Sequence, residues 1–249
     1  MYGPRAAVAF RHAEYERNRR IDLTGSEARE VADIQLDESY DYIAPLLEKG
    51  AEDAEILRDR LRALGFGAVD ICVSSPYRRT LQMAEIIYGG TPTEIIVDPN
   101  LRERDLGRFK DIPREVFHTD YAESYAHKVE DPLNWRPLEG ETLLEASQRA
   151  FEVYMREDIA GKLVAFSSHA DMIVAKRSLY HLGGLTTSEK LKQPLTPELQ
   201  NPQWIQNCQA DMYVEEDPTW GKVVRDMGYF RSIAVCGVEY DTGWIQIQR

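Results

Sequence analysis

Two short apolar runs in this chain end abruptly in a histidine. Residues 8–10 lead into Arg11 and His12, and residues 163–166 lead through two serines into His169. Buried strands of a parallel sheet would deliver such side chains to the carboxyl edge, where open α/β folds bind their ligands. Two histidines and an arginine at one point suit a dianionic phosphate better than a metal ion. The sequence therefore predicts phosphohistidine chemistry.

The remaining three histidines, His118, His127 and His181, have no supporting pattern, and we interpret them as structural or surface residues. The histidines also lack the close spacing typical of metal ligands, so we expect neither a metal site nor another cofactor. A lone histidine at a strand end is usually structural. The case for His12 and His169 therefore depends on their companions.

Composition limits the partners. The chain of 249 residues carries 30 Lys and Arg against 42 Asp and Glu, a formal net charge of -12. This balance argues against nucleic acid or an anionic membrane surface as the main partner. Any anion site must therefore be built locally from a few placed arginines.

Three cysteines lie far apart in the sequence and form neither a disulfide framework nor a metal motif, which favours a cytoplasmic location. No segment approaches the roughly 20 apolar residues of a membrane span. We interpret the apolar run at residues 6–10 as the first core strand rather than as a signal peptide.

Strand-like and helix-like segments alternate along most of the chain. We predict helices at about 50–65, from Ser75-Pro76 onward, at 141–157 and at 171–182, and a loop with short helical pieces at 14–35. We predict strands at residues 6–10, 69–73, 94–97 and 163–166. This alternation indicates an α/β fold, a three-layer α/β/α sandwich with a mostly parallel central sheet.

The pattern weakens after residue 185. Strands are predicted at 212–214 and 222–224, and residues 232–249 alternate apolar and polar side chains. We interpret residues 186–249 as a C-terminal edge-strand extension of one domain that spans residues 1–249, with its core at 5–185.

Five sequence blocks resemble those of the histidine phosphatase superfamily, in its phosphoglycerate-mutase-like branch. The family signature Arg-His-Gly-Glu, with an Asn six residues after the His, stands here as residues 11–14 with Asn18. The other four blocks follow in the family's order at residues 74–84, 101–107, 140–142 and 168–170. The resemblance covers about residues 5–185 and implies the phosphoglycerate-mutase-like fold.

The resemblance also implies roles for five residues. His12 would be the nucleophile, with its second ring nitrogen donating to a backbone carbonyl. Arg11 and Arg79 would bind phosphoryl oxygens, and His169 would add a charged donor. Glu103 would protonate the leaving oxygen, which requires a raised pKa.

Two neighbouring acids, Asp105 and Asp171, are possible substitutes for Glu103. A solvated charge cluster around Glu103 is the structural alternative to its catalytic role.

Asn18, Thr24 and Gly25 stand at positions that touch substrate in the family. This chain departs from the family pattern elsewhere. Ala13 and Ala170 replace glycines, which adds a methyl at two tight positions. Met83 replaces a Thr and Ile43 an Asp, and the segment after Gly25 is longer than usual. We expect these departures to alter the entrance of the site rather than its phosphate pocket.

These observations predict a metal-independent phosphomonoesterase acting on a small phosphorylated metabolite. A phosphoglycerate-mutase-type phosphotransferase is the nearest alternative, but residues 110–139 lack the Arg-Arg-Ser-Tyr-Asp segment of those mutases. A catalytically silent binding module is the alternative of another class. An edge strand could also pair across a homodimer.

Overall fold

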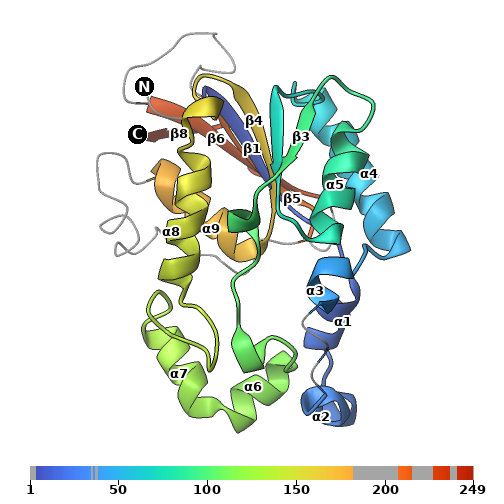
Figure 1. The fold of residues 1–249 in the computed structure, drawn as a ribbon, viewed down its shortest axis with the longest axis vertical. Helices are drawn as coiled ribbons and strands as arrows, with labels where there is room; N and C mark the ends of the chain where they lie inside the picture. The colour runs from blue at the N-terminus through green and yellow to red at the C-terminus, as the bar shows by residue number, and fades with distance from the viewer. Residues whose placement is uncertain are drawn as a thin grey trace.

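A mixed β-sheet runs through the molecule, with helices packed against both faces (Figure 1). The computed structural model describes residues 4–34, 36, 39–181, 207–214, 227–235 and 240–248. Within these residues the strand order is β3-β2-β4-β1-β5-β6-β7, with β8 also paired to β6. The α/β fold predicted from the sequence is thereby confirmed.

The parallel half of the sheet contains four strands, β1 (Ala6–Arg11), β2 (Ile71–Ser74), β3 (Glu94–Val97) and β4 (Leu163–Ser168). The remaining strands extend the sheet beyond β1 in antiparallel pairing, namely β5 (Gln209–Val214), β6 (Met227–Ala234), β7 (Tyr240–Asp241) and β8 (Ile245–Gln248). The predicted edge extension is present, although the strand predicted at 222–224 lies outside the described residues.

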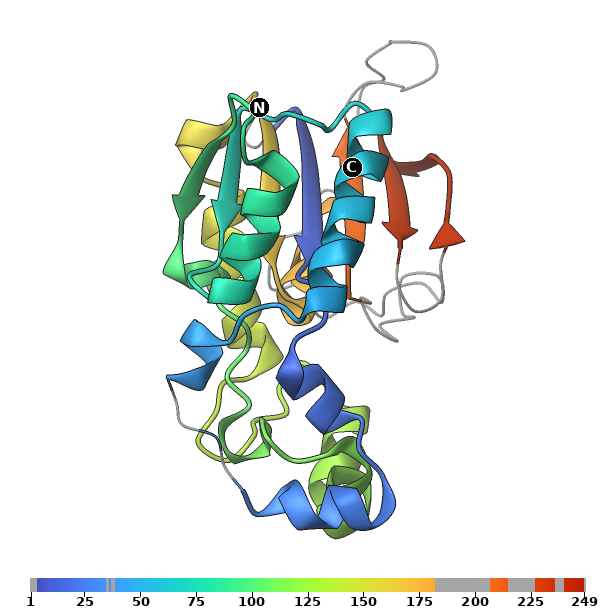
Figure 2. The same cartoon turned by 90° about the vertical axis from the view of Figure 1, so that its right-hand side faces the viewer.

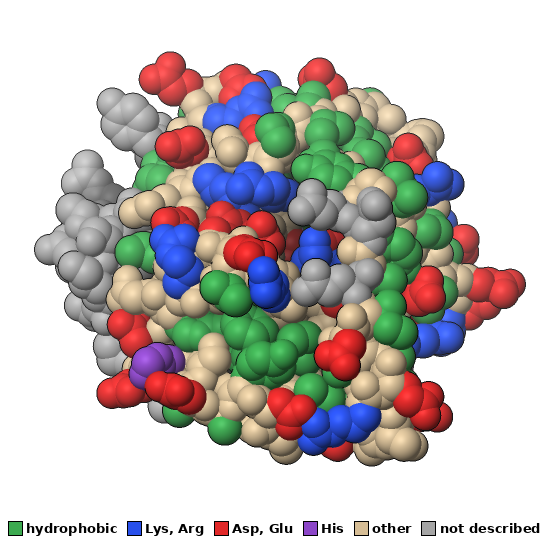
Figure 3. Space-filling view, turned by 60° about the horizontal axis from the view of Figure 1, so that its bottom comes forward, with side chains coloured by type: hydrophobic (Ala, Val, Ile, Leu, Met, Phe, Trp, Pro, Cys, Tyr) green, Lys and Arg blue, Asp and Glu red, His purple; other side chains and the backbone are tan. Residues whose placement is uncertain are grey.

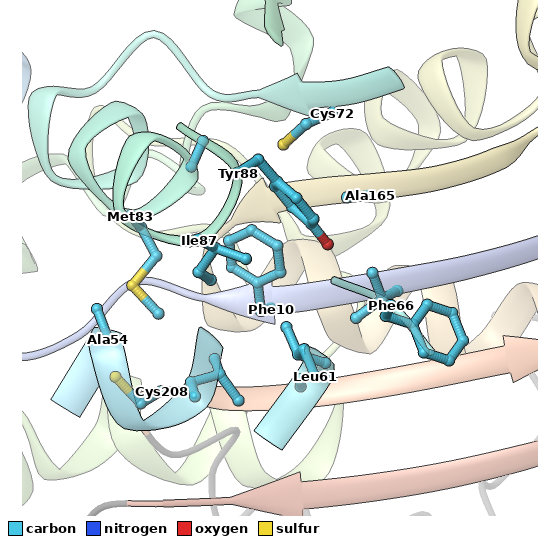
Figure 4. Close-up of a cluster of buried hydrophobic side chains, with 14 of the residues drawn as sticks. Phe10, Ala54, Leu61, Phe66, Cys72, Met83, Ile87, Tyr88, Ala165 and Cys208 are labelled. Atoms are coloured by element: carbon cyan, nitrogen blue, oxygen red, sulfur yellow. The ribbon is translucent and has the colours of Figure 1, made fainter. Parts of the chain in front are cut away.

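Helices α4 (Glu48–Ala63) and α5 (Arg78–Tyr88) cover one face of the sheet, and α8 (Leu143–Tyr154) and α9 (Ala170–His181) cover the other (Figures 1 and 2). Successive side chains of a strand point to opposite faces. Phe10 of β1 accordingly packs with the first pair of helices, and Ala9 with the second pair. Figure 4 shows Phe10 among the apolar side chains of α4 and α5.

A helical lobe lies beyond the carboxyl ends of the parallel strands (Figures 1 and 2). The lobe contains α1 (Glu16–Ile21), α2 (Gly25–Ala32), α3 (Tyr40–Ile43), α6 (Arg114–Asp120) and α7 (Ala122–Glu130). It has its own small core around Phe117 and Trp135. Short 3-10 turns at η1 (Pro99–Leu101), η2 (Gly107–Phe109) and η3 (Glu157–Ile159) link the other elements.

The sequence underestimated the helix content of this lobe. Where a loop with short helical pieces was predicted, Glu16–Ile21 and Gly25–Ala32 both form helices, and α2 buries Ala28 against the apolar cluster around Phe117 of α6. The predicted start of α5 at Ser75-Pro76 is also wrong, since the helix begins at Arg78. The Ser75 N–H donates to the Ser167 carbonyl at 3.0 Å, so these residues continue the sheet edge instead. None of the described helices is long and apolar enough to cross a lipid bilayer.

Candidate active site

The strand register brings the two histidines together. In the parallel pairing of β1 with β4, Arg11 lies beside Ser168, and the His12 N–H donates to the Ser168 carbonyl at 3.2 Å. His12 directly follows the last residue of β1, and His169 directly follows the last residue of β4. Their ring centroids are 5.1 Å apart. The prediction that both runs deliver a histidine to one point of the sheet edge therefore matches the geometry.

The neighbouring strand β2 adds the arginine. Ser74 pairs with Ser167, so the chain leaves β2 beside His169 and enters α5 at once. Arg79, the second residue of α5, is 1% exposed, and its Nη2 lies 3.5 Å from Nδ1 of His169. Arg79 thus faces both histidines, as the family pattern implied, whereas its neighbour Arg78 is exposed.

His12 is held in the tautomer that a nucleophile needs. Its Nδ1 lies 2.7 Å from the carbonyl oxygen of Ala13, and because a carbonyl can only accept, Nδ1 carries the proton. Nε2 then keeps its lone pair. Burial, followed by the charges of Arg79 and Arg11, lowers the pKa of His12 well below 6.5, so the ring is neutral at neutral pH.

His169 is also neutral in the free protein, which differs from the charged donor expected from the sequence. Burial is the largest cause of its lowered pKa, and the charge of Arg79 adds to it. Because a guanidinium can only donate, Nδ1 of His169 accepts from Arg79, and Nε2–H donates to Oγ of Ser75 at 2.9 Å. A bound dianion would favour the charged form of this ring.

Aromatic rings fix the guanidinium of Arg79. Its Cζ lies 4.2 Å from the ring centroid of Tyr15 and 4.6 Å from that of Tyr77. Both rings also contact a histidine, Tyr15 against His12 and Tyr77 against His169, each at 5.1 Å. Cation–π attraction favours a cation over the face of an aromatic ring, so the two rings stabilise the position of this guanidinium. Both tyrosines lie in or next to the sequence blocks, but no sequence pattern assigns them this role.

Glu103 lies on the loop after η1, close to Arg11. The carbonyl oxygens of Asn100, Arg102 and Glu103 all accept from the guanidinium of Arg149, at 2.7 to 3.1 Å. Arg149 is itself paired with Glu141 of the fourth sequence block. This cradle fixes the loop that presents Glu103 and explains why a Gly-Glu-Thr block accompanies the site.

The Glu103 carboxyl has the raised pKa that a proton donor requires. Burial and the charge of Asp171 raise it from 4.5 to about 7, although the Arg104 N–H and the arginines of the pocket oppose the shift. Asp171 is paired with Arg104 at 2.7 Å, and the exposed Asp105 accepts from the Gly107 N–H. Both alternatives are thus engaged elsewhere, and Glu103 fits the acid role best.

Arg11 ends β1 beside this carboxyl. Burial lowers its pKa, and the carboxylates of Glu103 and Asp171 oppose that shift. The guanidinium thus lies within electrostatic reach of both Glu103 and Arg79, and two neighbouring guanidiniums suit a ligand bearing negative charge.

Three residues predicted to bind substrate are placed differently. The Asn18 side chain accepts from the Tyr15 N–H at 3.3 Å and so shapes the loop after His12. Thr24 and Gly25 begin α2 in the helical lobe, away from the sheet edge (Figure 1), and the Gly25 N–H donates to Glu115. The structure does not bring Thr24 and Gly25 to the histidines, because the polar segment before them forms helix α1.

The alanine at position 13 is accommodated by a glycine opposite. Ala13 is fully buried, and a Cβ built on Gly50 would lie 3.3 Å from its methyl and 2.5 Å from the Glu14 carbonyl oxygen. Gly50 therefore leaves the space that the extra methyl needs.

The segment after Gly25 reaches Arg79, a residue expected to bind phosphate, contrary to the expectation that only the entrance of the site would change. The Asp41 carbonyl accepts from Nη1 of Arg79 at 2.8 Å, and the Asp41 carboxylate lies 3.6 Å from that nitrogen. The same carboxylate pairs with Arg17, whose Nε is 2.9 Å from Asp111. Figure 3, which brings the lobe end forward, shows acidic and basic side chains intermixed on this face.

This α/β fold, with two histidines, two arginines and a protonatable carboxyl at the end of its parallel strands, defines a phosphate-handling protein of the histidine phosphatase type. Residues 9–196 match the model of the histidine phosphatase superfamily (branch 1), and the chain belongs to that family. No group of three or more potential metal ligands lies together within the described residues.

Two curated relatives match parts of the chain. A probable 2-carboxy-D-arabinitol-1-phosphatase of Arabidopsis thaliana is 37% identical over 90 residues, 36% of this chain and 18% of the relative. A probable phosphoglycerate mutase GpmB of Cronobacter sakazakii is 31% identical over 106 residues, 43% of this chain and 48% of the relative. The matches thus span about half the length of these relatives or less.

Among solved structures, the α-ribazole phosphatase of Shigella flexneri superimposes with a TM-score of 0.58 at 16% identity, covering 86% of this chain and 92% of that one. A mycobacterial glucosyl-3-phosphoglycerate phosphatase also gives a TM-score of 0.58, at 19% identity, covering 87% and 94%. At such identities the likeness concerns the fold.

Proposed function

We propose that the protein is a metal-independent phosphomonoesterase that works through a phosphohistidine at His12. The observation that carries this proposal is that the protonation states of His12 and Glu103 complement each other. His12 is neutral with Nε2 unprotonated, and the Glu103 carboxyl, with a pKa of about 7, holds its proton in a large fraction of molecules at neutral pH. A group able to act as nucleophile and a group able to donate a proton thus occur together in one buried cluster around Arg11 and Arg79.

The chemistry then needs two displacements. In the first, Nε2 of His12 attacks phosphorus, the phosphorus–oxygen ester bond breaks, and the leaving oxygen takes the proton of Glu103. In the second, the Glu103 carboxylate takes a proton from water, whose oxygen attacks phosphorus and releases His12 and inorganic phosphate. Arg11, Arg79 and His169 would bind the phosphoryl oxygens, where charge stabilisation supplies most of the catalysis.

Hydrolysis of p-nitrophenyl phosphate in the presence of EDTA tests this proposal. We expect the wild type to turn over and His12→Ala to lose activity by at least about a thousandfold, as for other enzymes that lose a covalent nucleophile. His127→Ala, an exposed lobe histidine, is the matched control and should keep wild-type activity. Wild-type activity that EDTA abolishes would refute the metal-independent mechanism.

We further propose a small phosphorylated metabolite as substrate. The curated relatives are named for a carboxyarabinitol phosphate and for phosphoglycerate, so small phosphorylated carboxylic acids form the first panel. Release of inorganic phosphate from a panel member supports hydrolysis. Transfer of the phosphoryl group within the molecule, without release, would favour the mutase alternative instead.

A further inference from the structure

A four-membered charge network connects the helical lobe to the phosphate pocket. Arg17 of α1 lies between Asp111 and Asp41, and Asp41 of α3 lies between Arg17 and Arg79. All four side chains are at least four-fifths buried, with Asp41 the most exposed at 16%. The two carboxylates balance the two guanidiniums, so part of the charge of Arg79 is already neutralised before any ligand binds.

The position of Arg79 does not depend on the Asp41 carboxylate. Tyr15 and Tyr77 hold its guanidinium, and the backbone carbonyl of Asp41 accepts from Nη1 at 2.8 Å. The carboxylate lies 3.6 Å from the same nitrogen, beyond hydrogen-bonding distance. Its effect on Arg79 is therefore electrostatic rather than geometric.

Arg17 would keep a second carboxylate partner if the charge of Asp41 were removed. The almost fully buried Asp111 carboxylate lies 2.9 Å from Nε of Arg17 and compensates that guanidinium. Removing the charge of Asp41 would make this network one unit more positive. Both Arg17, which pairs directly with Asp41, and Arg79, 3.6 Å from it, would feel the change, and Arg79 is the one that lies beside His169.

We propose that Asp41 sets the phosphate affinity of the pocket, its carboxylate weakening the hold of Arg79 on a dianion so that product phosphate leaves readily. This inference rests on the proposed phosphatase function. The carboxylate of Asp41 and a phosphoryl dianion on Arg79 repel one another across a few ångströms of partly dehydrated space, where charge interactions are stronger than in water. Asp41 is thus a positioned charge that favours turnover over tight binding.

The variant Asp41→Asn tests the role, because the amide keeps the shape, an oxygen acceptor for Arg17 and the backbone carbonyl. Binding of inorganic phosphate is measured by isothermal titration calorimetry, which needs no turnover. We expect the variant to bind phosphate about tenfold more tightly than the wild type, the order that one nearby charge contributes at moderate screening. The KM for p-nitrophenyl phosphate should fall with the phosphate Kd.

Glu16→Gln is the matched control. Glu16 is exposed, accepts from the Tyr40 hydroxyl at 2.7 Å at the same α1–α3 contact, and carries the same charge without facing Arg79. Its phosphate Kd should stay at the wild-type value. Asp41→Glu keeps the charge and should bind phosphate as weakly as the wild type does. Thermal melting tests whether each variant is folded.

The possible outcomes separate the two proposals. Unchanged or weaker phosphate binding in folded Asp41→Asn would overturn the role of Asp41, since a residue that orients Arg79 would weaken binding when replaced. An equal gain in Asp41→Asn and Glu16→Gln would also overturn it, because the effect would then reflect net charge alone. A wild type that neither binds phosphate nor hydrolyses the ester would instead refute the proposed function.

Discussion

Glu103→Gln should stabilise the protein at alkaline pH while removing the proposed proton donor. The folded protein raises the pKa of this carboxyl from 4.5 to about 7. Below 4.5 the group is protonated in both the folded and the unfolded states and contributes no difference. As the pH rises through 4.5 to 7, the unfolded chain gives up the proton first, so the free energy of unfolding decreases.

The size of the effect follows from the shift. One pKa unit corresponds to about 1.36 kcal/mol, so the rise from 4.5 to about 7 costs the folded state about 3 kcal/mol once the pH exceeds 7. A glutamine side chain does not titrate in this range. Its amide oxygen can still accept the hydrogen bond that the Arg104 N–H donates to the Glu103 carboxyl at 3.0 Å. We expect the free energy of unfolding of Glu103→Gln to exceed that of the wild type by about 3 kcal/mol at pH 8 and by less than about 1 kcal/mol at pH 5.

Urea denaturation at the two pH values measures this difference. Glu130→Gln, at an exposed position ending α7, is the control and should change the free energy of unfolding little at either pH. The same Glu103→Gln preparation should lose activity by about a hundredfold or more. Equal stabilisation by Glu103→Gln at pH 5 and pH 8 would refute the reasoning, because a carboxyl with a raised pKa must give a pH-dependent difference.

Three further predictions concern the same site. The kcat/KM of the wild type should fall as the pH rises through about 7, where Glu103 loses its proton. This decrease at alkaline pH should be absent from the pH profile of Glu103→Gln. If the decrease persists in the variant, another group is the acid. Arg149→Met removes the cradle of the loop that carries Glu103 and takes from Glu141 the closer of its two arginine partners. Thermal and urea unfolding should show a loss of about 3 kcal/mol, and kcat should be lower. An unchanged kcat would separate the cradle from catalysis. Gly50→Ala places a methyl 2.5 Å from the Glu14 carbonyl oxygen, and the free energy of unfolding should fall by about 2 kcal/mol in the same assay. Gly161→Ala is the control, because a Cβ there meets open space. Its free energy of unfolding should fall only by the backbone strain of an alanine at positive φ.

Much of the fold was predictable because its signals are local. Each core strand is a short apolar run bounded by polar residues, and α4 carries an apolar stripe at helical spacing. The lobe was less predictable, since α1, α2, α6 and α7 are short, and the apolar cluster that holds α2 against α6 joins Ala28 to residues 112–135, far away in the sequence. The family resemblance also implied a substrate contact for Thr24 and Gly25. Helix α1 places these two residues away from the sheet edge.

The sequence by itself determined which residues could do chemistry, because His12 and His169 each end a buried strand and parallel strands place their carboxyl ends at one edge. Only the tertiary structure decided how these groups are tuned. Burial together with the charge of Arg79 keeps both imidazoles neutral, and burial together with Asp171 keeps Glu103 protonated up to about pH 7. Asp41, which contacts Arg79, lies in a segment that matches no sequence motif. These effects depend on distances between segments remote in the chain, which no local pattern encodes.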